Sequence, residues 1–148
     1  MNTHPYLRAF LAGILVPTLV MPLMLIGFIV LRFWLQVSVP IERGMVFPMA
    51  LVPGLWGIWN ILWIGSHART HLPIGLHGAL LPLLLMPGGA AITSCFGILA
   101  LGSHDAIWFQ TLHIPYALIL PMFMVALAAY YLVWKYVVGF LNHTLGIA

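Results

Sequence analysis

Residues 9–31 read AFLAGILVPTLVMPLMLIGFIVL, a run of 23 residues without a charged side chain. A helix needs about 20 consecutive apolar residues to cross the roughly 30 Å of hydrocarbon in a bilayer. Three more charge-free apolar runs follow, at residues 44–65, 78–101 and 114–134. The sequence therefore predicts four transmembrane helices.

The composition supports lipid as the solvent of this chain. Its 148 residues are 64% hydrophobic and 5% charged, whereas soluble domains carry about 25% charged residues. The polar residues gather in short connections at 32–43, 66–77 and 102–113, which leave no room for a soluble domain. Helices joined by short connections pack as antiparallel neighbours. We expect one all-α membrane domain over residues 1–148, a multi-pass antiparallel four-helix bundle.

A glycine and two prolines recur with the same spacing in the first three runs. An interior proline removes a backbone hydrogen bond and kinks a helix, so the pattern predicts bent helices. Bent helices that open a cavity are typical of transporters. Proline is also common in membrane helices for other reasons, and a duplicated helix would give the same pattern. The three matches are Gly13, Pro17 and Pro22; Gly44, Pro48 and Pro53; and Gly78, Pro82 and Pro87, while the fourth run has only Pro115 and Pro121.

The basic residues indicate an orientation, because lysine and arginine in short loops prefer the cytoplasmic side. With four spans, both termini lie on one side. That side carries Arg8, Arg69 and Lys135, and the other side carries Arg32 and Arg43. We therefore expect both termini in the cytoplasm.

Small residues recur at every fourth position of the third run, at Gly89, Thr93 and Gly97. Small side chains let helices approach closely in lipid, where van der Waals contact drives association. This face is predicted to be a tight helix contact. It can form within the chain or between copies in a homo-oligomer.

The second run carries a polar and aromatic stripe formed by Trp56, Asn60, Trp63 and His67. Spacings of three and four residues place these side chains on one helical face. An unsatisfied amide is costly in hydrocarbon, so Asn60 should face a partner helix or water. We predict that the stripe faces the bundle interior and binds a ligand. The alternative is an interhelical hydrogen bond from Asn60, with the tryptophans at headgroup level.

Three histidines, His67, His71 and His77, crowd the second connection. Histidine pairs bind zinc or copper, and a pair from two helices can hold haem iron. A zinc site needs further ligands, and Cys95, the single cysteine, stands alone. The three histidines are therefore either a metal or haem site or side chains facing lipid headgroups.

No catalytic motif accompanies these features, so no enzyme activity is predicted. The five basic residues do not cluster, which excludes a nucleic-acid surface. The predicted function is to bind or transport a small or amphipathic molecule between bent helices. The alternatives are an accessory subunit of a larger membrane complex and a haem- or metal-binding membrane protein. Its expected partners are the lipid bilayer and further copies or subunits.

Overall fold

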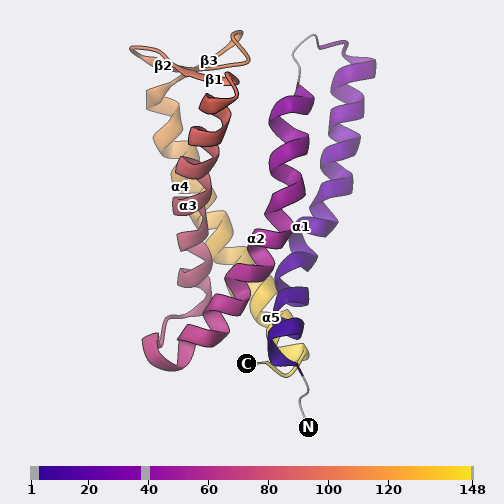
Figure 1. Ribbon diagram of the computed structural model, residues 1–148, viewed down its shortest axis with the longest axis vertical. Helices are drawn as coiled ribbons and strands as arrows, with labels where there is room; N and C mark the ends of the chain where they lie inside the picture. The colour runs from indigo at the N-terminus through magenta and orange to yellow at the C-terminus, as the bar shows by residue number, and fades with distance from the viewer. Residues whose placement is uncertain (1–3, 38–40, 148) are drawn as a thin grey trace.

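The computed structural model describes residues 4–37 and 41–147, with the side chains of residues 41–49 left out. The chain is mostly helical, with a small sheet between the third and fourth long helices (Figure 1). Its elements are, in order, α1 (Pro5–Ile29), η1 (Val30–Trp34), α2 (Ile41–Thr70), α3 (Ile74–Cys95), β1 (Leu99–Leu101), β2 (Asp105–Trp108), β3 (Leu112–Pro115), α4 (Tyr116–Leu132), η2 (Val133–Val138) and α5 (Gly139–Thr144).

Three helices are long and apolar enough to cross a membrane. They cover Pro5–Trp34, Ile74–Cys95 and Tyr116–Thr144, because η1 continues α1, and η2 and α5 continue α4. The segments η1 and η2 are π-helical turns within these longer helices. The remaining helix, α2, has 30 residues but is not among the three. Many large apolar side chains of the three helices are exposed, as expected where lipid replaces water.

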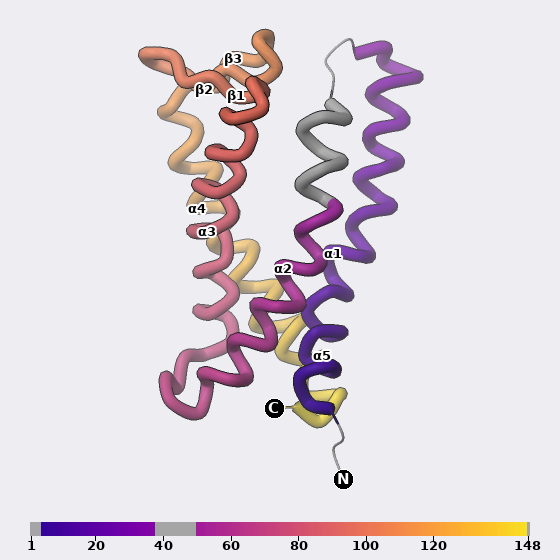
Figure 2. Tube along the Cα trace, viewed as in Figure 1, coloured from indigo at the N-terminus to yellow at the C-terminus, as the bar shows by residue number. Residues whose placement is uncertain are grey.

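The long helices run up and down in chain order, so that each is antiparallel to the next (Figure 1). Helix α1 packs against α2, and α3 packs against α4 and η2. Both termini and the α2–α3 connection lie at one end, called here the terminal end, and the sheet lies at the other. The two helix pairs meet toward the terminal end and diverge toward the sheet (Figure 2).

The all-α prediction is wrong in the third connection, which forms an antiparallel sheet in the order β1-β2-β3. The apolar run 78–101 is therefore not one helix, since α3 ends at Cys95 and β1 takes residues 99–101. Strand β1 pairs with β2, and β2 pairs with β3 from Asp105↔Pro115 to Trp108↔Leu112. The strand Leu99–Leu101 is as apolar as the helix before it, so composition alone hides the boundary.

Gly97 is the physical reason for the early end of α3. Its φ of +66° is a left-handed conformation that favours glycine. The Ile98 N–H donates to the Thr93 carbonyl at 2.9 Å, and the Gly97 N–H donates to the Ser94 carbonyl at 3.0 Å. This pair of bonds is the Schellman motif that closes a helix. Gly97 therefore ends the helix and does not belong to a helix face.

The small-residue face predicted on the third helix is packed within the chain at Thr93 but not at Gly89. A Cβ added at Gly89 would meet no atom within 4 Å. Thr93 is buried, but its hydroxyl donates to the Gly89 carbonyl of its own helix at 2.7 Å. The prediction of a tight helix contact within the chain is therefore wrong at Gly89.

The repeated glycine has a packing role in both described copies, whereas Gly44 and Pro48 lie outside the described side chains. A Cβ on Gly13 would lie 2.6 Å from the Trp56 carbonyl oxygen and 2.9 Å from the Gly57 Cα. A Cβ on Gly78 would overlap the Trp134 side chain. Glycine thus lets α1 touch the backbone of α2, and lets α3 accept a tryptophan from η2.

Gly13→Ala is expected to destabilise the protein by about 1–3 kcal/mol, because the added methyl group would push the α2 backbone away from α1. Gly27→Ala is the matched control in the same helix, since a Cβ there meets nothing within 4 Å. The control should be neutral or stabilising by roughly 0.5–1 kcal/mol through helix propensity. Reversible unfolding in mixed micelles measures both changes. Equal stability of the two variants would contradict the close approach of α1 and α2.

Candidate functional site

Asn60 holds three helical segments together. Its amide nitrogen donates to the Ala9 carbonyl of α1 at 2.8 Å and to the Asn142 side-chain oxygen of α5 at 2.8 Å. The Asn142 amide returns a hydrogen bond to the Asn60 oxygen at 3.0 Å. Both side chains are 0% exposed. The Asn60 amide therefore joins helices, and both of its N–H donors are already used.

The two tryptophans of the predicted stripe are buried on the same face of α2 as Asn60. Trp56 and Trp63 are each 5% exposed, whereas His67 is exposed. The Trp63 indole N–H donates to the Leu72 carbonyl at 3.1 Å, and the His67 ring lies tilted against the Trp63 ring with a centroid separation of 4.6 Å. His67 Nδ1 also lies 3.2 Å from the Leu72 oxygen. These contacts brace the turn from α2 to α3.

The three histidines do not converge on a metal. The part of the chain that the structure describes has no group of three or more His, Cys, Asp or Glu side chains placed to hold an ion. His77 Nε2 is paired with the Trp59 carbonyl oxygen at 2.9 Å, and the Trp59 indole N–H donates to the His77 carbonyl at 2.9 Å. His71 follows the end of α2 with a φ of +49° and is exposed.

An aromatic cluster lies where the two helix pairs meet. The rings of Trp56 from α2 and Trp134 from η2 have centroids 5.4 Å apart, and Tyr130 from α4 lies 5.1 Å from Trp56. Trp134 is 0% exposed, and Leu81 and Val138 complete the buried core around it. Trp134 sits in a π-helical turn, a distortion that is frequent at functional sites.

This cluster contains two buried donors that the protein does not satisfy. The indole N–H groups of Trp56 and Trp134 meet no hydrogen-bond acceptor among the described residues. The Tyr130 hydroxyl lies near the Trp56 indole, but the two groups do not have the geometry of a hydrogen bond. Leaving a buried donor unpaired costs about 1–3 kcal/mol. The indoles of Trp59 and Trp63, by contrast, both donate to carbonyl oxygens.

Sequence reasoning identified Trp56 but missed Trp134, Tyr130 and Asn142. The fourth apolar run was taken to end at Trp134, whereas the helix continues to Thr144. Asn142 therefore lies inside the long helix, and its amide is the partner that Asn60 requires. An amide about two helical turns beyond the apolar run was the available signal.

The Asn60–Asn142 pair predicts strong coupling between two substitutions. Asn60→Leu leaves the buried Asn142 amide without its partner, and Asn142→Leu leaves Asn60 only its bond to the Ala9 carbonyl, each at a cost of about 1–3 kcal/mol. The double variant replaces both partners with apolar groups, so its loss should fall short of the summed single losses by at least about 0.5 kcal/mol. Unfolding in micelles measures the cycle. Asn60→Leu combined with Thr144→Val is the control and should be additive, because among the described residues the Thr144 hydroxyl bonds only the Phe140 carbonyl of its own helix. Additivity in the asparagine cycle would rule out the pair.

No protein-family model, curated protein or solved structure matches this chain. The chemistry of the site therefore has to be inferred from its own side chains. Those side chains offer two unpaired indole donors, aromatic walls and an apolar floor, and they sit between helix pairs that Asn60 and Asn142 hold together.

Proposed function

We propose that this protein spans the membrane four times and binds a small amphipathic molecule between its two helix pairs. The bound molecule places a carbonyl or ether oxygen against the indole N–H of Trp134, with Trp56 and Tyr130 as aromatic walls. The unpaired, fully buried N–H of Trp134 is the observation that carries the proposal. Movement of the two helix pairs relative to each other would extend this function from binding to transport.

Four spans are supported by the length and direction of the helices. Three helices have the length and composition to span. Helix α2 contributes 30 residues, about 45 Å at 1.5 Å per residue, between two of them. It is the most polar of the four because Asn60 lies near its middle, paired inside the protein, and because further polar residues lie near its two ends. These are Glu42, Arg43, Ser66, His67, Arg69 and Thr70. A helix with polar groups only at its ends and on its inner face can cross a bilayer as well as a uniformly apolar one.

Cytoplasmic termini are supported by the distribution of charge. Arg8, Arg69 and Lys135 lie toward the terminal end, in α1, at the end of α2 and in η2. Asp105 lies in the sheet at the opposite end, paired with His113 at 2.6 Å. Basic residues in or beside short loops stay on the cytoplasmic side of the membrane. The terminal end is therefore the proposed cytoplasmic end.

The depth of the aromatic cluster favours a ligand site over a headgroup anchor. Trp56 lies midway between Ile41 and Thr70, and Tyr130 lies midway along the helix from Tyr116 to Thr144. Tryptophans that anchor a protein to headgroups lie at helix ends. Polar groups at mid-membrane depth between helices are where membrane transporters bind their substrates.

The depth of the aromatic cluster also limits the chemistry of its ligand. Charge is costly at mid-membrane depth. An amphipathic or flat apolar molecule is therefore the expected ligand, and a strongly charged one is not.

Topology reporters test the membrane arrangement. Fusions after Ala148 and within the connection 66–77 should both report cytoplasm. A fusion within the connection 102–113 should report the opposite side, because an odd number of spans separates it from each terminus. A cytoplasmic signal in the connection 102–113, or an external signal at Ala148, would contradict the proposed topology.

An isosteric replacement tests the ligand site. In 3-benzothienylalanine, sulfur replaces the indole N–H while ring shape is kept. Decyl-naphthoquinone, which carries two carbonyl oxygens, should raise the melting temperature of the wild-type protein more than decylnaphthalene, which has none. The isostere at Trp134 should weaken quinone binding by about tenfold, the loss of one hydrogen bond. It should raise the stability of the ligand-free protein by up to about 1–3 kcal/mol, because it removes a buried N–H that has no partner there.

The same isostere at Trp59 is the matched control. It breaks the hydrogen bond to the His77 carbonyl, so it should lower stability by about 0.5–1.5 kcal/mol while quinone affinity is retained. The proposal fails if the two probes stabilise the wild-type protein equally, or if quinone affinity survives replacement at Trp134.

A further inference from the structure

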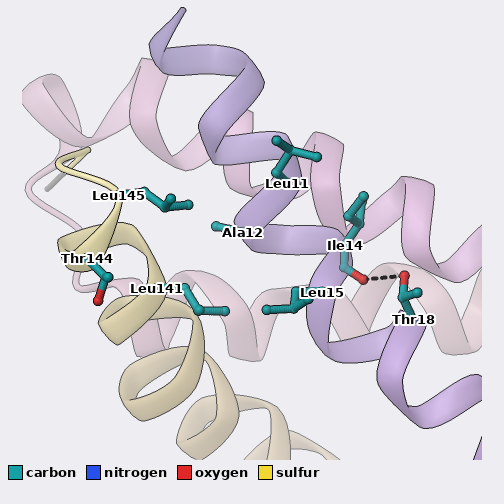
Figure 3. A pocket seen from close by; sticks show the side chains of 8 residues that line it. All are labelled: Leu11, Ala12, Ile14, Leu15, Thr18, Leu141, Thr144 and Leu145. Carbon is teal, nitrogen blue, oxygen red and sulfur yellow. Dashed lines mark hydrogen bonds between the residues drawn. The ribbon is translucent and has the colours of Figure 1, made fainter.

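A second candidate site shares no lining residue with the aromatic cluster. An apolar groove of about 320 Å³ runs between α1 and the C-terminal helix (Figure 3). This volume is in the lower range of ligand pockets. We call it the α1–α5 groove, and it is lined by Leu11, Ala12, Ile14, Leu15, Thr18, Leu141, Thr144 and Leu145.

The walls of the α1–α5 groove offer no free hydrogen-bonding hydroxyl. Thr18 donates to the Ile14 carbonyl at 2.7 Å, as Figure 3 shows, and Thr144 donates to the Phe140 carbonyl at 2.9 Å. The buried Ala12 leaves depth between the leucine side chains. Such a groove suits a hydrocarbon chain and does not suit a polar molecule. It is also too small for a second helix, whose diameter is about 10 Å.

One end of the groove carries positive charge. Arg8 lies one helical turn before Leu11 and Ala12, and its guanidinium donates to the carbonyl of Leu145, a residue of the groove wall, at 3.1 Å. This bond fixes the cation beside the terminal end of the groove. Helix α1 begins at Pro5, has no acidic residue in its first turn, and adds the positive end of its dipole.

An apolar slot that ends at an arginine and a helix N-terminus matches the two parts of an anionic phospholipid. We propose that the α1–α5 groove binds one acyl chain of such a lipid, with the lipid phosphate against Arg8. The charged end coincides with the proposed cytoplasmic end, where anionic lipids concentrate. This inference rests on the proposed insertion into the membrane, but it is independent of the ligand at Trp134.

Native mass spectrometry of the whole protein tests this site with an equimolar mixture of dioleoyl phosphatidylglycerol and dioleoyl phosphatidylcholine. The wild-type protein should retain one phosphatidylglycerol in preference to phosphatidylcholine. Arg8→Gln should reduce this preference by about fivefold, and Arg8→Lys should keep most of it. Leu15→Trp should fill the groove and abolish retention of both lipids. Leu15 is 41% exposed, so the larger side chain leaves the core unchanged.

Two variants serve as controls for position. Arg32→Gln removes a cation at the sheet end, and Leu19→Trp adds an indole to α1 outside the groove, where Leu19 is 65% exposed. Neither should alter lipid retention. The 3-benzothienylalanine variant at Trp134 should also retain phosphatidylglycerol, so failure of the Trp134 ligand proposal is distinguishable from failure of this one.

Four results would overturn the lipid site. The first is equal retention of the two lipids by the wild-type protein, and the second is unchanged retention in Leu15→Trp. The third is a lipid-free dimer that Leu15→Trp dissociates, which would place a second copy on the groove. Stabilisation by inorganic phosphate equal to that by phosphatidylglycerol would likewise exclude an acyl chain as the source of binding.

Discussion

The pairing of Asn60 with Asn142 is the contact on which the arrangement of the bundle depends. Lipid gives helices no hydrophobic reason to associate, because its tails are as apolar as leucine. A buried amide, however, has to find a partner. Asn60 finds two, the backbone of α1 at Ala9 and the side chain of Asn142 in α5. One side chain thus joins the α1–α2 pair to the end of the helix that begins with α4, and it fixes where the two pairs meet.

Close packing around the Asn60–Asn142 pair positions the aromatic cluster. Gly13 allows α1 to lie on the backbone of α2 beside Trp56, and Gly78 allows α3 to accept Trp134. The π-helical turn η2 changes the helical phase between Tyr130 and Asn142. Asn142 can therefore bond Asn60 while Trp134 turns toward Trp56. The cost of this arrangement is two indole N–H groups without acceptors in the described part of the chain, and an oxygen-bearing ligand would offset that cost.

The sequence was sufficient for the helical runs, their antiparallel order and the burial of Trp56, Asn60 and Trp63, because each follows from hydropathy or helical spacing. It was insufficient where the deciding feature is a conformation or a distant partner. The left-handed Gly97 ends α3 inside an apolar run, and the strand after it is as apolar as a span. The partner of Asn60 lies 82 residues away, so no local pattern could identify it. The histidines at 67, 71 and 77 shared a connection, but His77 is paired with Trp59 on the adjacent helix.

The buried Trp134 N–H is proposed to be the anchor of a ligand site between the helix pairs. The most direct test is an experimental density map of the protein taken from its native membrane into lipid nanodiscs, at a resolution that shows side chains. We expect density that the polypeptide does not explain, with an atom about 2.7–3.2 Å from Nε1 of Trp134. A map in which that nitrogen donates to a protein carbonyl, or is enclosed by apolar side chains with no additional density, would contradict the claim.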